Sequence, residues 1–271
     1  MRRTLVACAI GAVGALAAQP PAARPDGVTL TFLANEGVLL AGGGRTVLID
    51  GLFLPYESFA VPADSTQAAL QRARAPFDAV DLVLVTHRHG DHFHPAPVAA
   101  HLRANPRATL VTSRQVLDSL RAGAPAHAAA LAPRLVARTT APGTRRRETV
   151  GGVTIELLGL PHGGWRHRRV EHLAYVVELG GRRILHVGDA ELSESVLAPF
   201  RLDTARIDVA LLPAWAITDE DARRAVARWI RPRQVVAFHL GAGDTVRTPR
   251  AVRAALPGAV TLARSLQAHR W

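Results

Sequence analysis

The most informative segment of this chain is Thr86-His87-Arg88-His89-Gly90-Asp91-His92, a loop that holds three histidines and an aspartate. It continues from Asp81–Thr86, whose short continuous apolar run is typical of a buried central strand. Active sites of layered α/β folds gather where such strands end. The junction of the two segments is therefore the first place to expect chemistry.

The spacing within this loop predicts a metal site. Residues two apart point the same way in an extended loop, so His87 and His89 are expected to converge on one ion. Gly90 permits a turn, after which Asp91 and His92 face the other side. Imidazole nitrogen and carboxylate oxygen are ligands of Zn²⁺, and two histidines with one further ligand leave an open catalytic position.

A loop this short does not complete two metal sites, so further ligands are expected at other strand ends. Three polar residues stand in that context. They are His162 after a strand at 153–160, Asp189 after a strand at 183–187 and His239 after a strand at 235–238. All three residue types are metal ligands, and we expect them to lie near the histidine-rich loop.

The remaining elements predict one α/β (α+β) domain over residues 28–271. Apolar alternation or short apolar runs predict strands at 28–33, 38–41, 46–49, 108–112, 173–179 and 209–212. Helices are predicted at 64–74, 96–104, 113–122, 249–256 and in a segment capped by Thr218, while 123–150 has no clear pattern. This order of elements suits two mixed β-sheets packed together with helices outside.

Composition argues against a nucleic-acid partner despite a formal net charge of +11. The chain has 271 residues, of which 48% are hydrophobic and 20% charged, as in an ordinary globular protein. All 33 basic residues are arginines, which indicates a coding bias. They are scattered apart from Arg145–Arg147 and the group around Arg166, Arg168 and Arg169, so they form no continuous basic stripe.

The first residues predict export. Arg2 and Arg3 precede the apolar run Leu5–Ala18, which ends in small residues, as in a secretory signal peptide over 1–18. Residues 19–27 are proline-rich and predict a linker. We expect a periplasmic or secreted protein with no stable membrane span after cleavage. Cleavage would remove the lone Cys8, which excludes a thiolate nucleophile or ligand.

Taken together, these residues resemble the metallo-β-lactamase-fold hydrolases, over about Val28–Ala263. The resemblance rests on residues that occur in the family's order: Asp50, His87-x-His89-x-Asp91-His92, His162, Gly188-Asp189 and His239. It implies a four-layer αββα sandwich of two mixed β-sheets with outer helices, and a dinuclear site at its edge.

The resemblance also implies a role for each of these residues. His87, His89 and His162 would hold one metal. Asp91, His92 and His239 would hold the other, and Asp189 would bridge the two. Asp50 is expected to hydrogen-bond a ligand imidazole and fix its orientation. Two Zn²⁺ ions are expected, with Mn²⁺ or Fe²⁺ as alternatives.

Departures from particular members narrow the subgroup. Members with a cysteine ligand are excluded, because no cysteine would remain. The bridging Asp189 argues against the true β-lactamases that lack it. Flavo-di-iron members usually carry Glu where His89 stands, so zinc is favoured over a di-iron centre. The ligand pattern is similar to the L-ascorbate-6-phosphate lactonase, RNase Z and glyoxalase II types. The lactonase-like branch is favoured by three segments: Val38–Asp50, Leu179–Arg182 and Leu211–Pro213.

The implied function is hydrolysis of a small ester, lactone, amide or phosphodiester by a metal-bridging hydroxide. Asp91 is the expected catalytic residue, because it could orient the nucleophile and accept its proton. The alternatives are a metal-dependent nuclease or phosphodiesterase, a mononuclear-iron sulfur dioxygenase on the same ligand set, and a non-catalytic binding protein. The sequence identifies neither the substrate nor the oligomeric state.

Residues near His162 form a candidate substrate rim. His167 and His172 lie in an arginine-rich segment that either is a solvated loop or forms an anion-binding rim or a proton donor beside the metals. Trp165 and Trp215 either line the pocket or belong to the core. The remaining histidines are expected on the surface, in helices or in the core: His94, His101, His127, His186 and His269.

Overall fold

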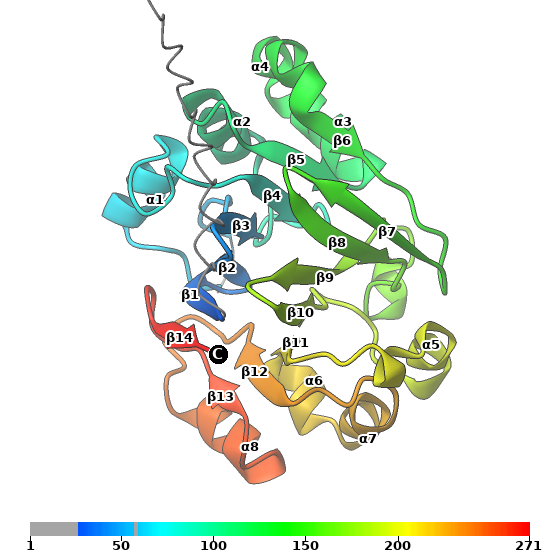
Figure 1. The fold of residues 1–271 in the computed structure, drawn as a ribbon. Coiled ribbons are helices and arrows are strands. Elements are labelled where there is room, and N and C mark those ends of the chain that lie inside the picture. The colour runs from blue at the N-terminus through cyan, green and yellow to red at the C-terminus, as the bar shows by residue number, and fades with distance from the viewer. Residues whose placement is uncertain (1–26, 57–58) are drawn as a thin grey trace, which may run out of the picture.

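The computed structural model describes residues 27–56 and 59–271, in which two seven-stranded sheets pack face to face (Figure 1). The first sheet contains β1 (Val28–Ala34), β2 (Gly37–Gly42), β3 (Arg45–Ile49), β4 (Leu82–Val85), β5 (Thr109–Thr112), β6 (Leu135–Ala137) and β14 (Ala268–Arg270). The second contains β7 (Arg145–Val150), β8 (Val153–Leu158), β9 (Ala174–Leu179), β10 (Arg182–His186), β11 (Val209–Pro213), β12 (Gln234–Phe238) and β13 (Val260–Thr261).

Helices cover the outer face of each sheet (Figure 1). The first sheet is covered by α1 (Asp64–Gln71), α2 (Pro95–Ala104), α3 (Arg114–Gly123) and α4 (Pro125–Leu131). The second is covered by α5 (Glu194–Leu197), α6 (Ala214–Thr218), α7 (Glu220–Trp229) and α8 (Arg247–Ala255). The expected four-layer αββα sandwich is therefore confirmed.

Both sheets are mixed, and their strand orders mirror one another. The first runs β14-β1-β2-β3-β4-β5-β6, and the second runs β13-β12-β11-β10-β9-β8-β7. In the first sheet β3 to β6 pair in parallel, and in the second β10 to β13 do so. The carboxyl ends of parallel strands meet at one edge of a sheet, and each sheet offers such an edge to the site.

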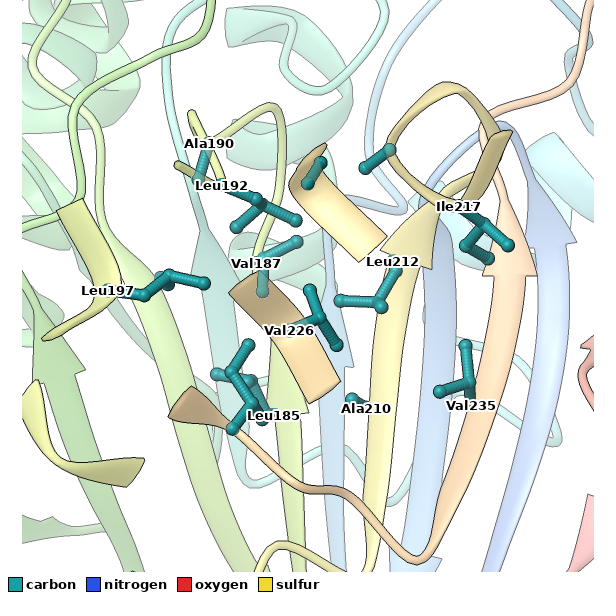
Figure 2. Packing of buried hydrophobic residues seen from close by; sticks show 14 of the residues in the cluster. Leu185, Val187, Ala190, Leu192, Leu197, Ala210, Leu212, Ile217, Val226 and Val235 are labelled. Carbon is teal, nitrogen blue, oxygen red and sulfur yellow. The ribbon is translucent and has the colours of Figure 1, made fainter. Parts of the chain in front are cut away.

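Alternation along the strands separates three apolar layers. In β4, Leu82 and Leu84 point into the core between the sheets, whereas Val83 and Val85 pack against the helices of the first sheet. The β10–β11 pair does the same for the second sheet, where Leu185 joins the outer layer shown in Figure 2. Burial on both faces explains why the central strands read as continuous apolar runs.

Three sequence expectations need correction or completion. The unassigned segment 123–150 contains α4, β6 and β7. The cap of α7 is Asp219, whose carboxylate accepts the Ala222 N–H at 2.8 Å, whereas Thr218 is the last residue of α6. The helix expected over 64–74 begins at Asp64 as predicted but ends earlier, at Gln71.

The N-terminal expectations stay predictions. The predicted signal peptide, Cys8 and all of the linker except Gly27 lie outside the described residues. Within 27–56 and 59–271, no helix has the length and apolar character needed to cross a membrane.

Candidate metal centre

The first group of candidate ligands comes from the loop after β4 and from two strand ends of the second sheet. His89 Nδ1 lies 2.9 Å from His87 Nε2 and 3.2 Å from His162 Nε2. Asp189 Oδ2 lies 3.7 Å from His87 Nε2 and 3.4 Å from His162 Nε2. Four ligand atoms from distant parts of the chain therefore surround one point.

The second group is built from Asp91, His92, His239 and the same Asp189. His92 Nε2 lies 3.4 Å from Asp91 Oδ2 and 3.5 Å from Asp189 Oδ2. His239 Nε2 lies 3.6 Å from Asp91 Oδ2 and 3.2 Å from Asp189 Oδ1. The structure thus brings together all seven residues that the sequence proposes as ligands, with Asp189 between the two groups.

These spacings fit a metal at the centre of each group. Ligands about 2.0–2.1 Å from a tetrahedral Zn²⁺ lie about 3.3 Å apart, close to the 2.9–3.7 Å between these atoms. His92 Nε2 and Asp189 Oδ1 are buried and have no hydrogen-bond partner. A metal ion between the groups would satisfy both atoms, which would otherwise be costly to bury.

Asp50 orients candidate ligands of both groups. The sequence resemblance implies this role for one ligand imidazole. Asp50 Oδ1 accepts the Thr86 N–H at 2.8 Å, and Asp50 Oδ2 accepts from the Thr86 hydroxyl and, at 2.9 Å, from His92 Nδ1. Thr86 Oγ1 in turn lies 3.0 Å from His87 Nδ1. With the Nδ1 atoms donating, the Nε2 lone pairs of His87 and His92 are free for a metal.

His162 is oriented by its own backbone. Its Nδ1 donates to the Gly163 carbonyl oxygen at 2.6 Å, which leaves the Nε2 lone pair facing His89 and Asp189. The Gly163 N–H donates to the Asp189 carbonyl oxygen at 2.7 Å and ties the two strand ends together. Both loops are thereby held in register at the point where they supply ligands.

Asn35 is a site residue that the sequence analysis missed. It lies in the turn between β1 and β2, and its Nδ2 donates to Asp91 Oδ2 at 3.1 Å and to the Asp91 carbonyl oxygen at 3.2 Å. The backbone carbonyl oxygen of Asn35 accepts the His239 N–H at 3.0 Å. One residue therefore positions two candidate ligands, Asp91 through its side chain and His239 through its backbone, and the only sequence signal is an Asn in a turn.

Left-handed backbone conformations mark the site. Asn35, Asp50 and His239 all have positive φ, at 51°, 44° and 56°. Such a conformation costs a non-glycine residue about 1–2 kcal/mol. Strain of this kind concentrates at functional sites, where the surrounding structure holds it in place.

Two imidazoles of the first group, those of His87 and His89, are held neutral. Burial, followed by the charge on His92, lowers the pKa of His87 well below its usual range. Burial and the neighbouring His162 and His167 lower the pKa of His89 to about 4. Neutral imidazole is the form that binds a metal.

The carboxylates at the centre are held ionised. Burial alone would raise the pKa of Asp189, but the surrounding His92, His162 and His239 hold it well below its usual range. Burial likewise opposes the lowered pKa of Asp91, which the hydrogen bond and charge of His92 produce. Burial would lower the pKa of His92 itself, but Asp189, Asp50 and Asp91 raise it. The ionised carboxylates thus draw positive charge to the centre, where a cation would sit.

Glu36 lies behind this centre and is fully buried, with neither carboxylate oxygen hydrogen-bonded. Its Oε2 is 3.8 Å from His92 Nδ1, and burial followed by the charge of Asp189 raises its pKa well above the usual range.

Asp50 and His186 lie near enough to Glu36 to suggest a third ion. However, His186 Nε2 contacts the Glu36 carbonyl oxygen at 3.0 Å and its Nδ1 accepts the Gly188 N–H, so no imidazole lone pair is free there.

The expected substrate rim is divided between surface and interior. His167 packs edge-on against His89 and at a tilt against His162, with ring centroids 4.8 and 4.6 Å apart. It lines a hollow of about 350 Å³ together with Trp215, which is 42% exposed, and with ligands from both groups. Trp165 is 73% exposed, and the guanidinium groups of Arg166 and Arg168 lie 5.8 Å from its ring.

His172 lies behind the ligands instead of at the rim. It is buried, its Nδ1 contacts the Leu160 carbonyl oxygen at 3.0 Å, and its ring centroid is 5.3 Å from that of His87. Burial lowers its pKa to about 3. His101 is likewise a buried helix residue, in contact with the Leu70 carbonyl oxygen, and not a surface one.

Two aromatic side chains from the loop after β3 cover part of the centre. Phe59 packs edge-on against His239 with ring centroids 4.9 Å apart. The Tyr56 ring lies over Gly90, where an added Cβ would come within 2.4 Å of it. The absence of a side chain at position 90 therefore lets Tyr56 approach the ligand loop closely.

Comparison with known proteins agrees with this geometry. The model of the beta-lactamase superfamily domain matches residues 45–262. The UPF0173 metal-dependent hydrolase of Polaromonas sp. is 29% identical over 184 residues, which cover 62% of this chain and 63%, under two thirds, of that relative. The UPF0173 metal-dependent hydrolase of Heliobacterium modesticaldum is 27% identical over 222 residues, covering 78% of this chain and 81% of the relative.

A solved structure shows the same fold. The metallo-beta-lactamase fold protein YhfI from Bacillus subtilis superposes with a TM-score of 0.58 at 15% identity, over 91% of this chain and 100% of that one. The resemblance stated from the sequence is confirmed for the superfamily, while the lactonase-like branch stays a prediction. Since the domain model spans most of the described residues and all seven candidate ligands, this chain belongs to the beta-lactamase superfamily domain family and has the metallo-β-lactamase fold.

Proposed function

We propose that this protein is an exported dinuclear zinc hydrolase that cleaves a small ester, lactone, amide or phosphodiester. One observation carries the proposal: two groups of buried or half-buried histidine and aspartate side chains share Asp189, and the ligand atoms of each group all lie within 4.8 Å of one another. Two adjacent metal sites are typical of hydrolytic centres.

The ligand chemistry favours zinc. Each group offers imidazole nitrogens together with carboxylate oxygens, a mixture that suits Zn²⁺ better than the all-oxygen sites of Mg²⁺ or Ca²⁺. One ion would be held by His87, His89 and His162. The other would be held by Asp91, His92 and His239, and Asp189 would bind both. When bound, such a pair supplies a hydroxide near neutral pH and polarises the substrate oxygen.

Asp91 is the residue we assign to proton transfer. Its Oδ2 faces His92 and His239, while Asn35 donates to the same oxygen and holds it in place. The carboxyl is ionised, because His92 holds its pKa below the usual range against the effect of burial. The carboxylate can therefore orient the attacking water and accept its proton.

The hollow above the centre fits a small substrate. Its volume of about 350 Å³ lies at the lower end of the range for small-molecule sites. Trp215 supplies an apolar wall, and His167 supplies a ring nitrogen beside His89 and His162. A substrate in this hollow would contact ligands of both groups at once.

Activity of the zinc-loaded protein tests the proposal. We expect hydrolysis of at least one member of a panel of lactones, phosphodiesters, thioesters and β-lactams. The His89→Ala and Asp189→Ala variants should lose it, whereas the matched control His127→Ala, an exposed histidine of α4, should retain it. Full activity in either ligand variant, or no turnover of any panel member by the wild type, would contradict the proposal.

Export is the other part of the proposal and rests on residues 1–18 of the sequence alone. We expect a Gram-negative host to release the protein from its periplasm with a new N-terminus near residue 18. Terminal sequencing of each cell fraction measures this. An intact N-terminus on protein confined to the cytoplasm would refute export and leave the hydrolase assignment untouched.

A further inference from the structure

A second cavity, of about 260 Å³, lies on the other side of His162 from the hollow. His162 lines both spaces, so a substrate whose reacting group sits at the metal centre could extend past this residue into the cavity. Counting about 30 Å³ for each water-sized group, the cavity has room for about eight. That is the size of a short acyl chain or a single aromatic ring.

The wall of this cavity combines apolar surface with arginines. The apolar part comes from Pro142, Leu160, Pro161, Val170 and Leu173. The cavity is also lined by three arginines: Arg138, and the exposed Arg168 and Arg169. An apolar wall with a few charged groups is the usual make-up of a site that binds one end of an amphipathic ligand.

Two of the three arginines have no carboxylate partner among the described residues. Arg138 is neutralised by Glu148, at 2.8 and 3.0 Å, whereas neither Arg168 nor Arg169 forms an ion pair within 27–56 and 59–271. The wall also holds one acidic residue, Glu171, whose Oε2 accepts the Gln115 N–H at 3.0 Å, so one carboxylate stands against these two arginines. The cavity therefore carries excess positive charge.

The segment that bears these arginines is fixed in place. The Gln115 side chain donates to the Arg169 carbonyl oxygen at 2.9 Å and accepts the Glu171 N–H at 3.1 Å. Thr140 also lines the cavity, and its hydroxyl is buried and has no hydrogen-bond partner. A ligand oxygen in the cavity would satisfy this hydroxyl, which otherwise stays unpaired.

We propose that this cavity binds the distal part of the substrate, an acyl or aryl group of about eight heavy atoms that ends in an anionic oxygen group. Arg168 and Arg169 would bind the anion, Thr140 would hydrogen-bond it, and the apolar wall would cover the chain. This inference rests on the proposed hydrolase function and adds its substrate class.

Binding of hexanoate, with hexanamide as its neutral match, tests the proposal without requiring turnover. Dissociation constants are measured by NMR titration of the zinc-loaded full chain. We expect hexanoate to bind at least tenfold more tightly than hexanamide. The double variant Arg168→Gln/Arg169→Gln should weaken hexanoate at least tenfold, and Thr140→Val about threefold. The control Arg166→Gln, in the same segment but outside the cavity wall, should change it less than twofold.

Three results would overturn the inference. Equal binding of hexanoate and hexanamide would show that the cavity does not select an anion. If hexanoate binds both the double arginine variant and Thr140→Val as tightly as the wild type, it binds at the metals and not in the cavity. If Arg166→Gln weakens hexanoate as much as the double arginine variant does, the anion responds to the general positive charge of the surface. Any of these results together with hydrolysis of the panel leaves the proposed function standing, while selective hexanoate binding without any hydrolysis refutes the function alone.

Discussion

Asp50 shows at the level of one residue how the centre is organised. Its carboxylate accepts from the Thr86 N–H, the Thr86 hydroxyl and His92 Nδ1, so it orients His92 directly and His87 through Thr86. Partners of this kind fix which ring nitrogen faces the metal. One buried side chain thus controls a ligand in each group.

We therefore predict that Asp50→Asn weakens zinc binding about 10–100-fold. The amide cannot accept from every donor around Asp50, and its NH₂ would face either Thr86 or the His92 Nδ1–H. Competition with a chromogenic zinc chelator gives the affinity of the variant. Asp64→Asn, at an exposed position at the start of α1, is the control. Unchanged zinc affinity in Asp50→Asn would refute the role of this carboxylate.

The seven candidate ligands could be predicted from the sequence because each lies in a recognisable context. Four sit in one compact motif, and the other three follow apolar strands. Asn35 and Glu36 could not be found this way. Asn35 acts through a left-handed turn and contacts across the fold, and the burial of Glu36 is a property of the packed molecule. Neither feature leaves a pattern in the local sequence.

At the level of elements, the turn after β10 carries the shared ligand. Gly188 has a φ of +58°, and an added Cβ would lie 2.7 Å from His172 Nε2 and 3.0 Å from Thr86 Cβ. Both contacts are tighter than normal packing allows. The turn that delivers Asp189 is therefore restricted to glycine by its backbone and by its neighbours.

Gly188→Ala should lower the free energy of unfolding by about 1–2 kcal/mol or more and should also weaken metal binding. Backbone strain accounts for the loss of stability, and displacement of Asp189 for the loss of metal. Urea denaturation followed by circular dichroism measures the first effect. Gly258→Ala, where an added Cβ meets nothing within 4 Å, should be near neutral. Equal stability of the two variants would argue against a tightly packed turn.

Asp81 joins neighbouring strands of the first sheet at the end away from the site. Its Oδ1 accepts from Arg107 at 2.7 Å and from Arg45 at 3.2 Å, and its Oδ2 accepts the Thr46 N–H at 3.0 Å. Burial opposes the effect of these contacts, which hold the pKa of Asp81 below its usual value. The ionised carboxylate is therefore the form that stabilises the fold.

This lowered pKa predicts a pH-dependent difference between the wild type and Asp81→Asn. The contribution of Asp81 is fully present above its unfolded pKa of about 3.9, and it disappears as pH falls through the lower folded value. The wild type should be the more stable at pH 6, and the gap should close below about pH 4. Urea unfolding midpoints of both proteins across this range measure it. A gap that stays constant down to pH 2 would contradict the ion-pair account.

The elements that escaped prediction are short or lie at an edge. In β7 every side chain is exposed or half-buried, so no apolar alternation marks it. Its arginines pair instead with glutamates: Arg145 with Glu156 at 3.3 Å, and Arg147 with Glu178 at 2.6 Å. The basic cluster that the sequence shows there is thus part of the sheet.

At the scale of the whole molecule, two mirrored sheets bring separate stretches of the chain to one place. The first sheet supplies the histidine-rich loop and Asp50, and the second supplies His162, Asp189 and His239. Burial of both faces of each central strand made the sandwich predictable from its apolar runs. The strand order, and the closing of the first sheet by β14, depend on contacts between distant residues that no local pattern reveals.

Metal analysis of the purified protein tests the central claim most directly, because one side chain is proposed to serve both metals. Inductively coupled plasma mass spectrometry should find two zinc ions per chain in the wild type, about one in His89→Ala and in His239→Ala, and fewer than one in Asp189→Ala. Circular dichroism confirms that each variant is folded. A wild type that binds no metal at neutral pH or a single iron, or an Asp189→Ala variant that keeps two zinc ions, would contradict the account.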